Sequence, residues 1–163
     1  TVVIGSDATA PDRSADMFRH MQQCMHYHRT HFHDPSWLPP GKALEMCTIE
    51  AARVLGLESE IGSLEPGKKA DVILVDLRRP HLYPAHMPEF RVTYFANGND
   101  VHTVLVGGKV LLRDRKPLHV DQDAVLDAAQ READLMIDRL GLRYALETPR
   151  MFWGHSRDLD LIE

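Results

Sequence analysis

The stretch that decides the fold is IGSLEPGKKADVILVDL, residues 61–77. Its dipeptide Pro66–Gly67, flanked by charged residues, predicts a tight turn. Residues 70–77 follow as an apolar run rich in branched side chains, which predicts a strand. Just upstream, apolar residues recur at helical spacing over residues 42–55, and Gly56 is placed to end that helix. The chain therefore changes from helical to β character within this stretch.

Downstream, the pattern predicts a hairpin and one further helix. The hairpin covers residues 101–112 and turns at Gly107–Gly108. Asp121 is placed to cap a helix over residues 123–140. Residues 142–163 mix aromatic and charged residues without a period, so we interpret them as a tail that packs on another surface or is partly disordered.

Upstream, the sequence predicts one buried strand and one helix before a loop. Residues 1–4 form a short β-branched run, which predicts the strand. The helix is predicted over residues 15–29, with Asp12 or Ser14 as its cap, and three prolines predict a loop over residues 30–41. One face of this helix carries Met17, Met21, Cys24, Met25 and His28. A lone strand with two helices cannot close a core, so we expect the chain to pack against a partner or to belong to a longer protein.

Composition excludes several classes of protein. The 163 residues are 44% hydrophobic, which is enough to bury a core, and the formal net charge is −5 without a basic cluster, which argues against nucleic-acid binding. No apolar run approaches the ~20 residues that span a bilayer, which argues against a membrane protein. The two cysteines, Cys24 and Cys47, predict free thiols in a reducing cytoplasm.

Asp7 is the first candidate for chemistry. A carboxylate one step beyond a buried strand, followed by a loop and a helix, lies where α/β barrels keep their active sites. There it is placed to ligate a metal and to accept a proton from bound water. The alternative is a turn residue or a helix cap, because Gly-Ser-Asp is common in turns.

A cluster of histidines is the second candidate. Its members, within fourteen residues, are His20, His26, His28, His31 and His33. Residues two apart on a helix point about 200° apart, so neither H-x-H pair can share one tetrahedral ion, although His28 and His31 have the spacing to do so. We interpret these side chains as exposed or pocket-lining; the alternatives are substrate contact, for which we name His20, His28 and His31, or a secondary zinc site.

Taken in order, these segments resemble the amidohydrolase superfamily. Residues 3–7 are similar to the end of the family's eighth barrel strand, and ALEMCTIEAARVLGL, residues 43–57, resembles a helix of the family. Residues 61–72 are the most specific match, to the junction where the chain leaves the barrel for a small β-sandwich. The resemblance is nearest to cytosine, guanine and adenosine-type deaminases and triazine chlorohydrolases, of which this chain corresponds to the C-terminal portion only.

The resemblance implies an α/β fold in three parts. Residues 1–57 would be the terminal β/α unit of a (β/α)8 TIM-like barrel. Residues 58–120 would form part of the accessory β-sandwich, and residues 121–163 a C-terminal helix and tail.

The resemblance also implies a metal-dependent hydrolase that deaminates a nitrogen heterocycle with one divalent metal, zinc or iron. Of the family's metal-site residues only the aspartate after strand eight has a counterpart, Asp7, as metal ligand and proton carrier. The other ligands are absent from this chain, so we expect it to be inactive alone. Its partners would be a small heterocyclic substrate and a second copy or a missing N-terminal part. Two alternatives stay open: a non-enzymatic His-rich module that binds metal or a partner, and one subunit of a split hydrolase.

Overall fold

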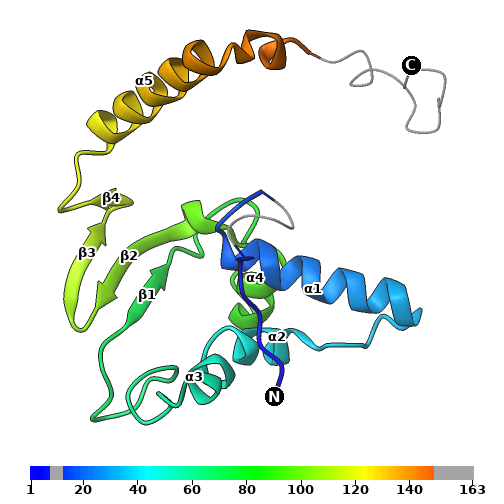
Figure 1. Cartoon of the computed structure of the whole chain (residues 1–163). Helices are drawn as coiled ribbons and strands as arrows, with labels where there is room; N and C mark the ends of the chain where they lie inside the picture. The colour runs from blue at the N-terminus through cyan, green and yellow to red at the C-terminus, as the bar shows by residue number, and fades with distance from the viewer. Residues whose placement is uncertain (8–12, 149–163) are drawn as a thin grey trace. The chain divides into compact units, whose positions relative to one another are not determined.

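The computed structural model describes residues 1–7 and 13–148, and it divides the chain into two units. The first unit covers residues 1–119 and combines four helices with a four-stranded antiparallel sheet (Figure 1). The second unit starts at Val120 and contains one long helix. Each unit is described by itself. The chain is thus a mixed α/β protein.

Helix α1, Met17–Phe32, contributes half of the core residues of the first unit. Its N-cap is Asp16, which differs from the expected Asp12 or Ser14, because the Asp16 carboxylate accepts a hydrogen bond from the Phe18 amide. The prediction of which side of this helix faces the core is partly wrong, since Phe18 is buried while His28 is exposed. The core residues are Phe18, Met21, Met25, Ala43, Leu82 and Ala96.

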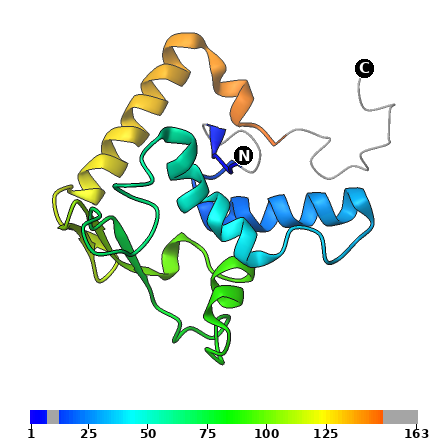
Figure 2. The same cartoon turned by 90° about the horizontal axis from the view of Figure 1, so that it is seen from below.

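Two short helices replace the single helix expected over residues 42–55. These are α2, Pro40–Met46, which packs against α1 (Figure 2), and α3, Ile49–Leu55, which ends at Gly56 as expected. The break has a local cause. The Thr48 hydroxyl donates to the Leu44 carbonyl at 2.8 Å, the acceptor that its amide would use in a continuous helix, and the amide bonds to Glu45 instead.

The turn after α3 requires glycine at position 62. Gly62 has φ +93°, and a Cβ there would lie 2.7 Å from the Cβ of Ala52. The close approach of this turn to α3 therefore leaves no room for a larger side chain at position 62.

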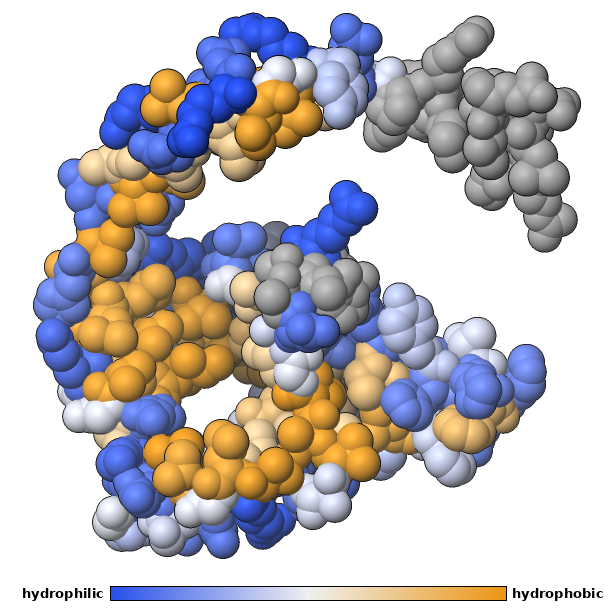
Figure 3. All heavy atoms as spheres, in the orientation of Figure 1, coloured by the Kyte–Doolittle hydropathy of each residue, from blue (hydrophilic) through white to orange (hydrophobic). Residues whose placement is uncertain are grey.

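The sheet consists of four strands in sequential order. They are β1, Val72–Val75; β2, Val101–Val106; β3, Lys109–Arg113; and β4, Lys116–Pro117. The predicted hairpin is confirmed, because β2 pairs with β3 and both glycines of the turn have positive φ. Apolar side chains gather over the strands (Figure 3), and those of Ile73, Leu74 and Val106 are about half exposed.

The long connection from β1 to β2 folds back onto α1. It contains α4, Pro88–Tyr94, and the 3-10 helix η2, Gly98–Asp100, neither of which was expected. Leu82 and Ala96 from this connection are buried in the core.

The second unit contains α5, Gln122–Leu140, with the expected cap at Asp121, followed by the 3-10 helix η3, Leu142–Leu146. The part of the expected tail that follows residue 148 lies outside the described residues. Over the described ranges, no helix is long and apolar enough to cross a membrane.

The strand expected over residues 1–4 is not formed. The segment is extended, but no described strand pairs with it, and its one backbone bond to the rest of the unit runs from the Ile4 amide to the Met46 carbonyl at 3.3 Å. A β-strand needs a neighbouring strand to satisfy its polar groups, and none of β1 to β4 pairs with residues 1–4.

Candidate functional site

Helix α1 presents the three candidate histidines at different depths. His20 lies at the end of the first turn of the helix and is buried, with 4% of its surface exposed. His28 and His31 lie in the last turns and are exposed. The same helix therefore offers one interior and two surface imidazoles.

A hollow of about 230 Å³ lies between the start of the chain and one side of α1. It is referred to below as the histidine hollow. Its lining residues are Ile4, Gly5, His20, Gln23, Cys24, Tyr27 and His28. Ile4 and Gly5 immediately precede Ser6–Asp7, so the hollow adjoins the segment that carries the candidate carboxylate.

A second hollow, of about 340 Å³, is lined entirely by rings: Tyr27, His28, His31 and Phe32. The His31 and Phe32 rings meet edge to face with centroids 4.8 Å apart, and Phe32 lies 4.4 Å from Trp37. Such aromatic walls suit a planar heterocycle. The structure thus brings His20 together with His28, and His28 with His31, but places no single hollow around all three.

Hydrogen bonding fixes the ring of His28, and burial keeps the neighbouring thiols protonated. The Nδ1 atom of His28 lies 2.8 Å from the carbonyl oxygen of Cys24, one turn earlier. Burial raises the pKa of the Cys24 thiol, and burial together with the nearby Cys24 raises the pKa of Cys47 to about 11. Both cysteines are free, as expected from the sequence, and at neutral pH both are thiols rather than metal-binding thiolates.

Asp7 stands at the end of the extended segment with φ +38°, and it is exposed. It lines neither hollow, and Asp16, not Asp7, caps α1. Within residues 1–7 and 13–148, no three histidine, cysteine or acidic side chains are grouped so as to hold a metal ion. These residues by themselves therefore do not fit a metal.

Three residues of α1 that line the histidine hollow were not expected there from the sequence: Gln23, Cys24 and Tyr27. The available signal was their spacing, because positions 20, 23, 24, 27 and 28 share one side of a helix. That side could not be assigned to a hollow without knowing that residues 4 and 5 lie against it.

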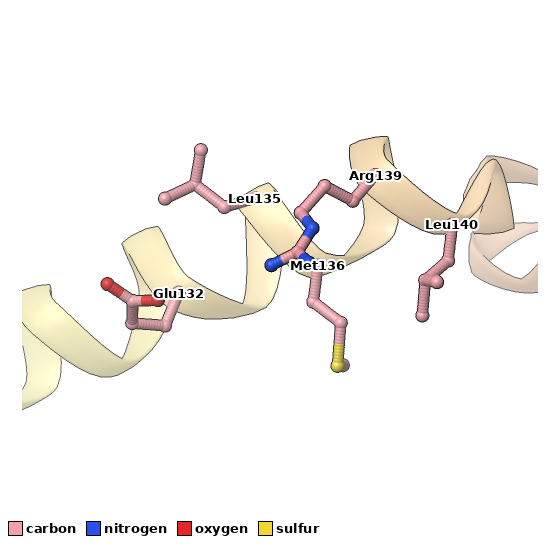
Figure 4. Close-up of a pocket in the computed structure, with 5 residues that line it drawn as sticks. All are labelled: Glu132, Leu135, Met136, Arg139 and Leu140. Atoms are coloured by element: carbon pink, nitrogen blue, oxygen red, sulfur yellow. The ribbon is translucent and has the colours of Figure 1, made fainter.

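The second unit has a hollow of its own, of about 360 Å³, on the surface of α5 (Figure 4). All five lining residues belong to that one helix: Glu132, Leu135, Met136, Arg139 and Leu140. Because its walls are long side chains of a single helix, this hollow has no set of polar groups arriving from different elements, and we do not treat it as the candidate site.

The comparison with known proteins identifies the family. The model of the amidohydrolase family matches residues 1–111, and the chain belongs to that family. It is 43% identical over 137 residues to a 5-methylthioadenosine/S-adenosylhomocysteine deaminase of Desulforudis audaxviator, a match that covers 84% of this chain and 32% of that protein. It is 38% identical over 146 residues to an S-triazine hydrolase of Gordonia rubripertincta, covering 87% and 31%. The chain spans about a third of the length of these relatives.

Solved structures agree with this assignment. An adenosine deaminase from Xanthomonas campestris with bound zinc superposes with a TM-score of 0.73 at 30% identity, covering 77% of this chain and 28% of the other. An atrazine chlorohydrolase from Arthrobacter aurescens, also with zinc, gives a TM-score of 0.65 over 78% of this chain and 28% of the other; at 23% identity it shows the fold alone. The chain therefore has part of an amidohydrolase fold.

Proposed function

We propose that this chain is the C-terminal portion of a metal-dependent amidohydrolase that removes an amino group from a carbon of a nitrogen heterocycle by hydrolysis. The observation that carries the proposal is the 43% identity to a deaminase over 84% of the chain. The names of the relatives refer to adenosine derivatives and to triazines, and both kinds of ring carry substituents on carbons bonded to a ring nitrogen. Loss of a halide from such a carbon is the less favoured variant of the same reaction.

The proposed architecture assigns residues 1–57 to the last β/α unit of a barrel, residues 58–120 to an accessory β-sandwich and residues 121–163 to a terminal helix and tail. Residues 1–4 would become a strand by pairing with barrel strands outside this chain. Their extended conformation and half-buried Val3 and Ile4 support this assignment. The half-exposed apolar residues of the sheet support a sandwich whose other layer lies elsewhere.

In this proposal Asp7 supplies one ligand to a divalent metal, zinc or iron, and accepts a proton there. The remaining ligands come from residues other than those described, in a longer protein or a partner chain. His20, His28 and His31 contact the heterocycle through the two hollows. The polypeptide of 163 residues is accordingly expected to be inactive by itself.

Metal analysis of the purified chain tests the role of Asp7. After gentle chelation and dialysis we expect less than about one tenth of an equivalent of metal, in the unchanged chain and in Asp7→Asn alike, because a single carboxylate binds an ion weakly. Asp127→Asn, an exposed change on α5, is the matched control. One tight metal that Asp7→Asn removes would show a complete site and contradict the proposal of outside ligands. Metal that survives Asp7→Asn would favour the His-rich binding module instead.

Turnover is the second arm of the test. The longer protein that contains this chain should deaminate 5′-methylthioadenosine, and Asp7→Asn should abolish that activity. Stoichiometric turnover by the 163-residue polypeptide would contradict the proposed division of the site.

A further inference from the structure

We infer, on the basis of the function proposed above, that Asp16 is a positioning residue for the reaction. Through the backbone of Gly98 it fastens the first turn of α1, and with it one wall of the histidine hollow, to the turn that leads into β2. The pair is referred to below as the Asp16–Gly98 clamp.

Both oxygens of the Asp16 carboxylate accept backbone hydrogen bonds. Oδ1 accepts from the Phe18 amide at 2.9 Å, which caps α1. Oδ2 accepts from the Gly98 amide at 2.8 Å, across 82 residues of sequence. Asn and Asp cap helices equally well, so the cap alone does not need a carboxylate. The second oxygen is what makes Asp16 a connection between two distant parts of the chain.

The donor at Gly98 is held rigidly. Asn97 and Asp100 form a reciprocal capping box around η2, in which the Asn97 amide donates to the Asp100 carboxylate at 2.9 Å. Asp100 is 1% exposed, and its carboxylate also lies 2.9 Å from Nε2 of His81. Its carbonyl accepts from the Asp76 amide at 2.8 Å, just beyond β1. The short segment that carries the Gly98 amide is therefore connected to the end of β1 through Asp100.

Asp16, which accepts the hydrogen bond from Gly98, lies close in sequence to a residue that lines the histidine hollow. One turn after Asp16, the buried His20 lines that hollow opposite Ile4 and Gly5. A second hydrogen bond to the same turn runs from Nε2 of Gln22 to the Ala96 carbonyl at 3.1 Å. Because Gln22 lies a turn and a half further along, the clamp is the one of these two hydrogen bonds that lies at the very start of the helix. Its loss should let the first turn shift while the rest of α1 stays in place.

Two substitutions at Gly98 test this hydrogen bond. Gly98→Pro removes the donor, at a position that opens η2 after an extended residue, Asn97 at φ −143° and ψ 172°. Because the proline Cδ replaces the amide hydrogen that faces Asp16, it also pushes the carboxylate away, so Asp16→Asn, which removes the same bond without adding an atom, is measured beside it. Gly98→Ala keeps the donor and adds a Cβ that would lie 3.6 Å from Oδ2 of Asp16, an ordinary contact. The alanine variant is therefore the matched reference.

The assay uses the longer protein that contains this chain, with 5′-methylthioadenosine as substrate and rates normalised to folded protein. Relative to Gly98→Ala, Gly98→Pro should lower kcat between about tenfold and about a hundredfold, with KM changed less than about threefold. Asp16→Asn keeps the cap but presents an amide that cannot accept from Gly98, so it should match Gly98→Pro. Because both changes remove one bond, the double variant should lose no more than either.

Hydrogen exchange gives a readout that does not depend on turnover. Amides of residues 17–20 should exchange faster in Gly98→Pro than in Gly98→Ala, while those of β2 keep their rates. Equal exchange at residues 17–20 in the two variants, or losses of kcat that multiply in the double variant, would overturn the inference. If the unchanged protein turns over no adenine nucleoside or triazine, the proposed function fails and the positioning role fails with it; faster exchange would then show that the clamp exists as a structural contact only.

Discussion

Replacing Gly62 by alanine tests the tight turn that joins the helical and β parts of the first unit. The new Cβ would lie 2.7 Å from the Cβ of Ala52, 3.0 Å from the Cα of Ile49 and 3.2 Å from the Thr48 carbonyl. Gly67, in the next turn, has the same φ of +93° but nothing within 4 Å of its added carbon. Gly67→Ala therefore measures the conformational cost alone, and Gly62→Ala measures that cost together with the clash.

The two costs can be estimated separately. Forcing alanine into a positive φ costs about 1–2 kcal/mol, which is the expected loss for Gly67→Ala. Overpacking against a helix backbone, which cannot move aside as a flexible side chain would, adds about 1–3 kcal/mol. Gly62→Ala should then lose about 2–5 kcal/mol, and its Tm should lie roughly 4–12 °C below that of Gly67→Ala.

Urea unfolding followed by circular dichroism is the assay, on the same protein background for both variants. A change of midpoint at constant slope identifies a change of stability rather than of the unfolded state. Equal losses for Gly62→Ala and Gly67→Ala would refute the reasoning, because the contact with Ala52 would then contribute nothing.

Three further predictions concern the core, a surface carboxylate and a thiol. Met25→Ala should cost about 2–5 kcal/mol in urea unfolding because Met25 is fully buried, whereas Met87→Ala, at a residue 56% exposed, should cost far less. The Arg78 amide and the Arg115 guanidinium lower the pKa of Asp76, so Asp76→Asn should reduce stability at pH 7. That difference should shrink as the pH falls from about 4 through the lowered pKa; a constant difference down to pH 2 would contradict it. At pH 8, Cys47 should react with iodoacetamide about tenfold slower than in the urea-unfolded chain, since a pKa of about 11 reduces its thiolate while raising the reactivity of what remains. Equal rates measured by mass spectrometry would rule this out.

The elements that the sequence predicted correctly depend on local chemistry. Asp121 and the run that follows it predict α5 within one residue, and two consecutive glycines predict the hairpin turn. The two elements that were predicted incorrectly depend on interactions that a local sequence pattern does not reveal. A continuous helix was expected where the Thr48 hydroxyl competes for a carbonyl, and a strand was expected over residues 1–4, where the described residues provide no partner.

The candidate site divides in the same way. The histidines on one helix could be named from the sequence, because their number and spacing are visible there. Which of them share a hollow could not, since His20 and His28 meet around Ile4 and Gly5, which approach α1 only through tertiary packing. The unexpected role of Asp16 has the same origin, because its second partner lies 82 residues away.

By itself the sequence determined the family and the order of helix, turn and hairpin, since each rests on residues adjacent along the chain. Only the tertiary structure decided how α1 is held and which side chains surround its histidines. Backbone propensities and turn chemistry act over a few residues, whereas the Asp16–Gly98 clamp and the contact of Gly62 with Ala52 exist only after distant segments have packed.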